Sequence, residues 1–552
     1  MTAFKFIRPT TVTDSAGSFT RSTTATYFDV DGVMQTAAID VPRIGYDPVT
    51  HAHTGLILEG AGTNLLLRSQ EFDNAAWTKD TTTITANSIA APDGTVSADT
   101  QTTSGSGGSN TGWTQSAIIT VSTSTTYTAS RYVKQGNTAT SIYSLARVSP
   151  YSVIFATITW GATPSVVGSG ADLLGSSITA AGNGWWRVSL TMSSATATQM
   201  AERLYTRDFS TSVQSGDTVY TWGAQLEAGS TATSYIPTTS AAVTRAADVV
   251  TGSGLIYTDV PEADYAAWVG GTTYTALTSY VIRTTATTHK IYQCLVTHTT
   301  AATPEDNTTG VTPKWLEIGP TNRWGMFDRK VGTETTQATS MTYLLKPGRA
   351  NSLGLLGIDA DSVEVSLVAN DEIVYAASID LNSGNTVGDW YQYFYEPIYS
   401  TDAVAITNLL DAALMDLPAY GDGVLCVRFL ATAGDVTCGV LAVGLYAELG
   451  TTLYDPTIGI IDYSRKSVDA FGNYDITERT YSKRMSATLM VESTDVDNTA
   501  RLLTQYRATP VVWVGADNLY SSLIIYGFCK DWEETIKGPT YSTCSIQIEG
   551  LT

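Results

Sequence analysis

Charged residues, and basic ones above all, are scarce in this chain. Only 15% of the 552 residues are charged, and 31 Lys and Arg against 52 Asp and Glu give a net charge of −21. A nucleic-acid-binding protein needs clustered Lys and Arg for the phosphates, and an anionic bilayer repels an acidic surface. We therefore expect no nucleic-acid partner and no docking on an anionic membrane.

Cysteine and histidine are too few and too scattered for a recognisable metal or redox centre. The five cysteines show no C-x-x-C spacing, so we expect buried thiols in a protein assembled in a cytoplasm. They are Cys294, Cys426, Cys438, Cys529 and Cys544. His51 and His53 would share one face of a strand, with Asp47 as the only near third ligand. We interpret both as exposed turn histidines and predict no metal site and no cofactor.

Long hydrophobic runs are missing as well. The N-terminal residues lack the apolar core of a signal peptide, and no stretch reaches the ~18 apolar residues of a membrane span. The longest apolar run, Cys438 to Leu449, is predicted to be a buried strand. We expect a soluble protein that leaves the cell when the cell lyses.

Threonine, serine, glycine and aromatic residues take the place of charge. β-Branched threonine fits a pleated strand, and residues 186–193 (WRVSLTMS) alternate apolar and polar side chains, as a half-buried strand does. The predicted fold is mainly β and multidomain. It consists of β-sandwich or jelly-roll modules, with a few short helices in the C-terminal part.

Turn signals and composition divide the chain into five predicted parts. These are a β arm for attachment at 1–64, a jelly roll at 65–250, a small β module at 265–320, a β-rich domain at 321–448 and an α+β domain at 449–552. Asp31-Gly32 predicts a hairpin turn in the arm, and a linker is predicted over 249–264. We expect helices over 402–417 and 496–508.

No recognisable catalytic constellation is present. The sequence has no phosphate-binding loop, no nucleophile elbow and no H-E-x-x-H motif. Glycan hydrolysis uses paired carboxylates, and acids do lie near aromatic residues, but 52 acids make such neighbours common. Examples are Asp264, Asp328, Asp389 and Glu396. We predict no catalytic residue and no enzyme activity, and a glycan hydrolase is the alternative.

Three segments resemble known protein families. Five blocks in order resemble a carbohydrate-binding-type jelly roll that is common in phage tail fibres and other virion adhesins: TNLLLRSQEFDNAAWTK, APDGTVSAD, YTASRYVK, GWWRVSLT and TWGAQLEAGSTATSYIPTT. Residues 265–320 resemble a short chitin-binding-type module. The segment from Asp469 onward resembles the C-terminal domains of tailed-phage minor tail and baseplate proteins.

The chitin-binding resemblance implies a glycan-contact role for aromatic residues, because sugar rings stack on Trp and Tyr. The residues that match the pattern of that family are Trp268, Tyr274, Tyr292 and Trp315. Core packing is the alternative for each of them; we expect it for Trp268 and leave Trp315 open. Core packing is also expected for Trp185, Trp186 and Trp222, with one of the adjacent pair pointing outward.

A tyrosine-rich segment, DWYQYFYEPIY at 389–399, predicts another contact surface. On a strand, Tyr391, Tyr393 and Tyr395 would share one face, and tyrosine is typical of binding interfaces. We interpret this face as a contact with a neighbouring subunit or with a glycan.

Together these resemblances imply a structural protein of a tailed-bacteriophage virion, in the tail tip, baseplate or fibre, that contributes to adhesion to host-surface glycans. The expected partners are other tail or baseplate subunits and a host glycan. A homo-oligomer, most simply a trimer, is expected, with residues 1–64 packed on another subunit or domain. The protein would be assembled in the host cytoplasm and released in the virion by lysis. The alternatives are a tailspike-like glycan hydrolase and a structural connector without sugar binding.

Overall fold

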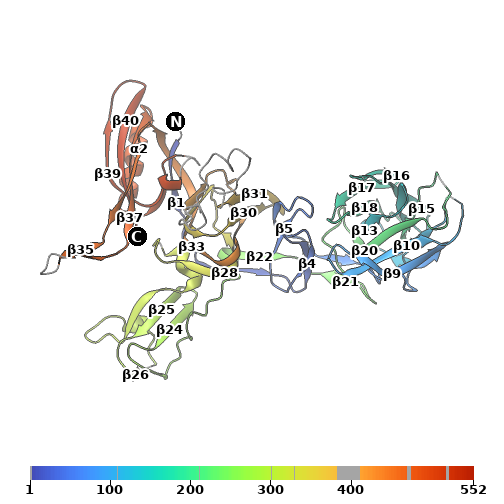
Figure 1. Ribbon diagram of the computed structural model, residues 1–552, viewed down its shortest axis with the longest axis horizontal. Helices are drawn as coiled ribbons and strands as arrows, with labels where there is room; N and C mark the ends of the chain where they lie inside the picture. The colour runs from blue at the N-terminus through green and yellow to red at the C-terminus, as the bar shows by residue number, and fades with distance from the viewer. Residues whose placement is uncertain are drawn as a thin grey trace. The chain divides into compact units, whose positions relative to one another are not determined.

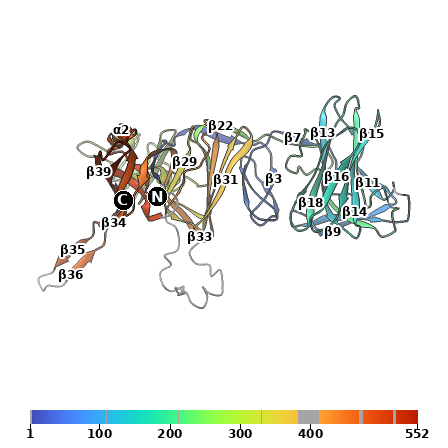
Figure 2. The same ribbon diagram turned by 90° about the horizontal axis from the view of Figure 1, so that it is seen from above.

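The computed structural model describes residues 3–108, 110–210, 212–299, 301–328, 330–381, 411–468, 474–516 and 521–551 (Figures 1 and 2). The chain forms two compact units. We call Phe19–Val249 the sandwich unit, and Met1–Ser18 together with Val250–Thr552 the large-sheet unit. The described residues are mainly β and form several sheets, as the sequence predicts. None of the helices in the described ranges is long and apolar enough to cross a membrane.

Two antiparallel sheets build the sandwich unit. The first has the order β17 (Leu173–Ala180), β18 (Trp185–Ser193), β13 (Thr126–Gln135), β20 (Thr218–Ala228), β10 (Val96–Thr103) and β9 (Thr82–Ala90). The second has the order β16 (Ser165–Ser169), β15 (Ser152–Thr159), β14 (Thr140–Arg147), β19 (Gln199–Tyr205), β11 (Trp113–Gln115) and β8 (Thr78–Asp80), with β12 (Ile119–Thr120) beside β19. One hydrophobic core contains residues of both sheets.

The alternation predicted for residues 186–193 places β18 in this core. Val188, Leu190 and Met192 are fully buried in it, and Trp186 packs partly against it. Trp185 points to the opposite face, as expected of its neighbour, yet it is also buried. The reason is that a hairpin from the N-terminal residues covers that outer face.

This covering hairpin consists of β3 (Ala25–Phe28) and β4 (Met34–Ala37), and its turn holds Asp31-Gly32 as predicted. Met34 joins Tyr132, Trp185 and Trp222 in a second core. A further hairpin, β5 (Arg43–Tyr46) with β6 (His53–Ile57), follows it, and β7 (Gly62–Asn64) pairs with β21 (Val243–Arg245) near the end of the unit.

A buried charge cluster joins the beginning and the end of the sandwich unit. Asp248 accepts from Arg21 at 3.0 Å and from Arg43 at 2.6 Å, and Glu59 pairs with Arg43 at 2.9 Å and Arg245 at 3.2 Å. Burial alone would raise the pKa of Glu59, but the two arginines and hydrogen bonds from Ser234 outweigh it and lower that pKa. The cluster therefore favours the ionised form of Glu59.

The large-sheet unit is organised around β33 (Val424–Thr452), a 29-residue strand. The sheet has the order β2 (Asp14–Thr20), β22 (Val249–Thr258), β28 (Thr335–Lys346), β33, β1 (Ala3–Pro9), β38 (Val511–Val514), β39 (Ile524–Thr535), β40 (Tyr541–Gly550), β37 (Tyr481–Glu492) and β34 (Thr457–Asp462). Four more strands branch from it: β29 (Ser352–Asp359), β30 (Ser362–Ala369), β31 (Glu372–Asp380) and β32 (Asp411–Leu414).

Smaller elements complete this unit. Helix α2 (Val496–Tyr506) packs on β37 and β39 and confirms the helix predicted at 496–508. The residues of the small module carry a three-stranded sheet and a two-stranded one: β24 (Tyr280–Thr285), β25 (Thr288–Cys294) and β27 (Trp315–Pro320), and β23 (Thr273–Tyr274) with β26 (His298–Thr299). The remaining elements are β35 (Arg465–Val468), β36 (Tyr474–Thr477), and the 3-10 helices η1 (Glu305–Asn307), η2 (Asn322–Phe327) and η3 (Ser521–Leu523).

Several sequence-based expectations about this unit are wrong. The predicted linker over 249–264 contains β22, which pairs with β28 across the sheet. The predicted boundary at 448/449 falls inside β33. Residues 3–9 of the predicted arm form β1 between β33 and β38, so the arm does not fold as one piece. Of the helix predicted over 402–417, residues 411–414 form β32 and residues 402–410 lie outside the described residues.

Replacing Asp248 with Asn tests the charge cluster. The variant leaves Arg21 buried without its carboxylate partner and leaves Arg43 with Glu59 alone, and breaking a buried pair in this way costs about 3–5 kcal/mol. We expect hydrogen exchange of peptides from residues 19–249, followed against urea concentration, to give a lower unfolding midpoint for the variant than for the wild type. The control is Glu71→Gln in the partly exposed Arg68–Glu71 pair, where the change should stay below about 1 kcal/mol. Equal midpoints for both variants would contradict a stabilising cluster.

Candidate binding surfaces

The four aromatic residues predicted to bind glycan do lie together in the small module. Tyr274, Tyr292 and Trp315 are buried in one core with Val281 and Cys294, and Trp268 packs against that core. The rings of Tyr274 and Trp315 meet edge to face with centroids 5.0 Å apart. The Trp315 side chain is 0% exposed, so this residue, left open above, belongs to the core.

The physical reason for this correction is the size of the module. A domain this small has few residues for a core, and large aromatic rings supply the apolar surface. A fully buried ring cannot stack on a sugar, so Tyr292 and Trp315 hold the module together. Trp268 keeps a half-exposed ring, and the guanidinium of Arg283 lies 5.0 Å from its centroid.

The structure describes only some of the other residues singled out in the sequence. Tyr391, Tyr393 and Tyr395 lie outside the described residues. His51 is exposed in a turn, where its ring Nδ1 lies 2.8 Å from the carbonyl oxygen of Val30, while His53 is half-buried against Tyr46. Within the described ranges, no group of three or more His, Cys, Asp or Glu is arranged to hold a metal ion.

All five cysteines are buried free thiols, as predicted. Burial raises the pKa of Cys426 and of Cys544 to about 12 and that of Cys529 to about 11. Because the thiolate is the reactive form of cysteine, these groups are poor nucleophiles at neutral pH.

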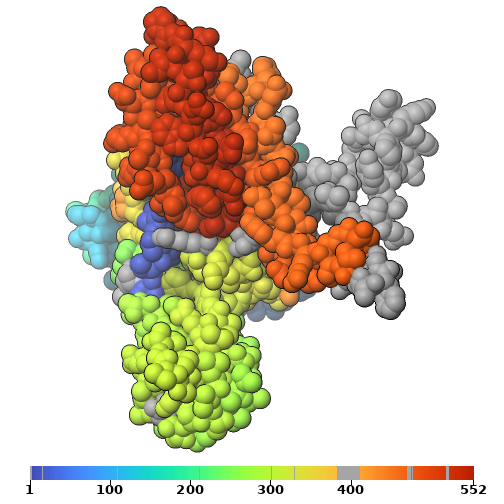
Figure 3. All heavy atoms as spheres, turned by 90° about the vertical axis from the view of Figure 1, so that its left-hand side faces the viewer, coloured from blue at the N-terminus to red at the C-terminus, as the bar shows by residue number. Residues whose placement is uncertain are grey.

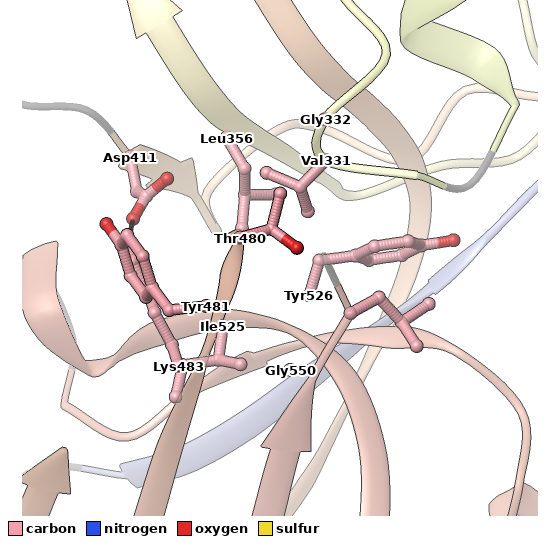
Figure 4. Close-up of a pocket in the computed structure, with 11 residues that line it drawn as sticks. Val331, Gly332, Leu356, Asp411, Thr480, Tyr481, Lys483, Ile525, Tyr526 and Gly550 are labelled. Carbon is pink, nitrogen blue, oxygen red and sulfur yellow. Dashed lines mark hydrogen bonds and ion pairs between the residues drawn. The ribbon is translucent and has the colours of Figure 1, made fainter. Parts of the chain in front are cut away.

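One pocket of the large-sheet unit is apolar with a single ion pair at its wall (Figure 4). Its volume is about 230 Å³, and Leu356, Ile525 and Tyr526 line it together with Asp411 and Lys483. Burial raises the pKa of Asp411, and the ammonium of Lys483, bonded to its carboxylate, opposes that shift. Among the described residues, Asp411 is the one carboxylate that lines this pocket, whereas glycan hydrolysis uses a pair.

A second pocket, of about 810 Å³, is lined by several titratable side chains. Asp14, His289, Trp324 and Asp328 are among its lining residues. The imidazole of His289 stacks on Trp324 and lies between the carboxylates of Glu262 at 2.9 Å and Asp14 at 3.1 Å. Burial raises the pKa of Asp328. Burial also acts to raise the pKa of Glu262, but hydrogen bonds from His289 and Thr321 outweigh it, so the net shift is downward.

The third surface is a hydroxyl-lined groove of about 330 Å³ on the sandwich unit, which we call the β17–β18 groove. It lies on the outer face of the six-stranded sheet, where residues 230–232 form its far wall. Its lining residues are Gly175, Ser176, Ser177, Thr179, Arg187, Ser189, Thr191, Ser230, Thr231 and Ala232. No carboxylate lines it. The sequence signal was the polar half of the alternation in WRVSLTMS, which alone cannot distinguish a solvent-facing strand from a groove floor.

Comparisons with known proteins add little to this geometry. No protein-family model matches the chain, and no curated protein matches it. Among solved structures, the N-terminal CBM22-1–CBM22-2 tandem domain of Xyn10C from Paenibacillus barcinonensis is similar over 70% of this chain and 98% of that chain, with 10% sequence identity. The TM-score is 0.21, a value too low to support an argument about this protein.

Replacing Trp315 with Ala tests the correction for the small module. Removing a fully buried Trp costs about 3–5 kcal/mol, so hydrogen exchange of residues 265–320 in the full chain should become fast. Tyr265→Ala is the control, because Tyr265 is exposed and stacks only on Tyr280. If Trp315→Ala exchanges as slowly as wild type, the core assignment is wrong.

Proposed function

We propose that this chain is a structural protein of a tailed-bacteriophage virion, located in the tail tip, baseplate or fibre, that contributes to adhesion to host-surface glycans. The sequence resemblances described above support this proposal. Its partners would be other tail or baseplate subunits and a host glycan, in a homo-oligomer that we expect to be a trimer. Assembly in the host cytoplasm and release by lysis follow from the same proposal.

The observation that carries the assembly part is a projecting hairpin with exposed apolar side chains. Strands β34 and β37 pair at the edge of the large sheet and lead into the β35–β36 hairpin. This hairpin extends away from the large sheet (Figures 1 and 3). Ile458 and Ile460 on β34 are each 55% exposed and share one face. Val468 at 58% stands directly opposite Tyr474 at 66%, and Ile476 is 68% exposed.

Such a surface is unusual for a protein that works alone. Single exposed apolar residues are common, but a series of large ones along one element marks an interaction surface. A projecting hairpin can reach a neighbouring subunit, and its apolar residues become stabilising once that subunit covers them. This supports a structural role inside an assembly.

A triple variant of the projecting hairpin, Ile458→Ser, Ile460→Ser and Ile476→Ser, tests this role. Because these side chains are exposed within the chain, we expect the melting temperature of the purified protein to change little. Incorporation into particles, measured by immunoblot of purified virions, should fall at least tenfold. The control is Val96→Ser with Val167→Ser, two exposed valines of the sandwich unit. Normal incorporation of the triple variant would remove the main support for the proposal.

A glycan hydrolase is the second candidate, and the 810 Å³ pocket is what favours it. Environments that push the pKa values of two carboxyl groups apart suit acid and base roles. The pKa of Asp328, which lines the pocket, is raised, and that of Glu262, which bonds to the pocket residue His289, is lowered. The sequence resemblances favour an adhesin, and we propose that the chain does not hydrolyse glycan.

Incubation of the purified chain with host polysaccharide separates the two candidates. We expect no release of reducing ends by the wild type or by Asp328→Asn. Release that is abolished in Asp328→Asn but retained in Glu317→Gln, a variant of another residue that lines the same pocket, would establish the hydrolase instead.

A further inference from the structure

The β17–β18 groove contains an arginine without an acidic partner. The guanidinium of Arg187 donates from Nη1 to the carbonyl oxygen of Thr233 at 2.6 Å, and from Nη2 and Nε to the hydroxyl of Ser130 at 2.9 and 3.2 Å. It also lies 5.3 Å from the ring centroid of Tyr132. These contacts hold the side chain in place and leave further N–H groups of the fork available to a ligand.

Other arginines of the same unit behave differently. Ion pairs with carboxylates are made by Arg21, Arg43, Arg68, Arg131, Arg147, Arg207 and Arg245. Within the described residues of the sandwich unit, only Arg187 and Arg203 have no carboxylate within 4.0 Å. Of these two, Arg187 lines the β17–β18 groove.

The neighbouring charges do not neutralise Arg187. The buried charge cluster described above contains Arg21, Arg43 and Arg245 with Glu59 and Asp248, and Glu227, which interacts electrostatically with Arg245, brings the acids to three. Three against three leaves that cluster neutral, so Arg187 adds one uncompensated positive charge at the groove. The overall charge of −21 repels anions at long range. Salt at physiological ionic strength screens charges that lie more than about 8 Å apart, so this repulsion is weak at the groove.

The rest of the groove offers hydroxyl groups. The hydroxyls of Ser177 and Ser189 lie 2.7 Å apart, and the hydroxyl of Thr191 lies 2.9 Å from that of Thr128. A hydroxyl both donates and accepts, which matches the hydroxyls of a sugar ring. The lining residues that the structure describes include no aromatic ring but do include Arg187, so a charged contact would supply much of the selectivity.

We propose that the β17–β18 groove binds an anionic saccharide, one that carries a carboxylate, sulfate or phosphate, and that Arg187 holds the anion. Arginine suits this role because its planar fork binds such oxyanions in a bidentate manner. The inference rests on the adhesion part of the proposed function and deepens it by naming the class of glycan. The serine and threonine hydroxyls would contact the neutral part of the sugar.

The test measures binding of the full chain to three immobilised polymers: polygalacturonate, dextran sulfate and neutral dextran. We expect wild type to be retained by at least one acidic polymer, less so at 0.5 M salt, and not by neutral dextran. Arg187→Gln should weaken that binding at least tenfold, while Arg187→Lys retains part of it. The control Arg203→Gln removes the other arginine without a carboxylate partner and should bind like wild type.

A second variant keeps the test valid if Arg187→Gln folds poorly. Ser177→Asp places a negative charge in the groove at an exposed position and should abolish binding of the acidic polymers, whereas Ser165→Asp on the other sheet should not. Wild-type affinity in folded Arg187→Gln, or equal binding of neutral dextran, would overturn the anionic assignment while leaving glycan adhesion intact. If folded wild type binds neither these polymers nor host polysaccharide, glycan adhesion itself fails.

Discussion

The large-sheet unit depends on the pairing of one strand, β33. Residues 424–430 pair with β28 on one edge and β30 on the other, and residues 444–451 pair with β1. Its side chains alternate between separate cores: Leu441 and Val443 enter one, Val440 and Ala442 another. Because a buried backbone group must find a partner, shifting this strand by one residue would disrupt its pairing with several strands of the sheet at once and exchange the side chains between the cores.

Two glycines make this continuous strand possible. An added Cβ at Gly444 would lie 1.9 Å from the carbonyl oxygen of Arg8, so β1 can approach only because no side chain is there. Gly450 has a φ of +137°, which residues with a side chain rarely adopt. The neighbouring sequence indicates neither requirement. The one at Gly444 arises from Arg8, more than 400 residues earlier in the chain, and the one at Gly450 arises where the strand passes β37.

What the sequence predicts well is local, and what it misses depends on distant partners. The hairpin at Asp31-Gly32, helix α2 and the alternation of β18 follow from short-range patterns. Local sequence predicts a linker where β22 lies, because the pairing of β22 with β28 joins residues about ninety positions apart. The prediction that the aromatic residues of the small module bind glycan is wrong for another reason. Trp and Tyr serve equally in a core and as a stacking surface for sugars, and only their burial distinguishes the two roles. Arg187 belongs to no recognisable sequence motif. Its lack of a carboxylate partner becomes apparent only when the partners of the other arginines are known.

The pairing of β2 with β22 has a consequence for how such a protein can change. Thr13 accepts a hydrogen bond from Leu255, and Ser18 contacts Thr251, so the chain leaves and re-enters the large-sheet unit on neighbouring strands. Adjacent strands lie only ~4.8 Å apart. The sandwich unit is thus an insertion between two strands that would otherwise form an ordinary hairpin. A domain whose ends lie this close together fits the same junction, so exchanging residues 19–249 for such a domain leaves the strand order of the large sheet unchanged.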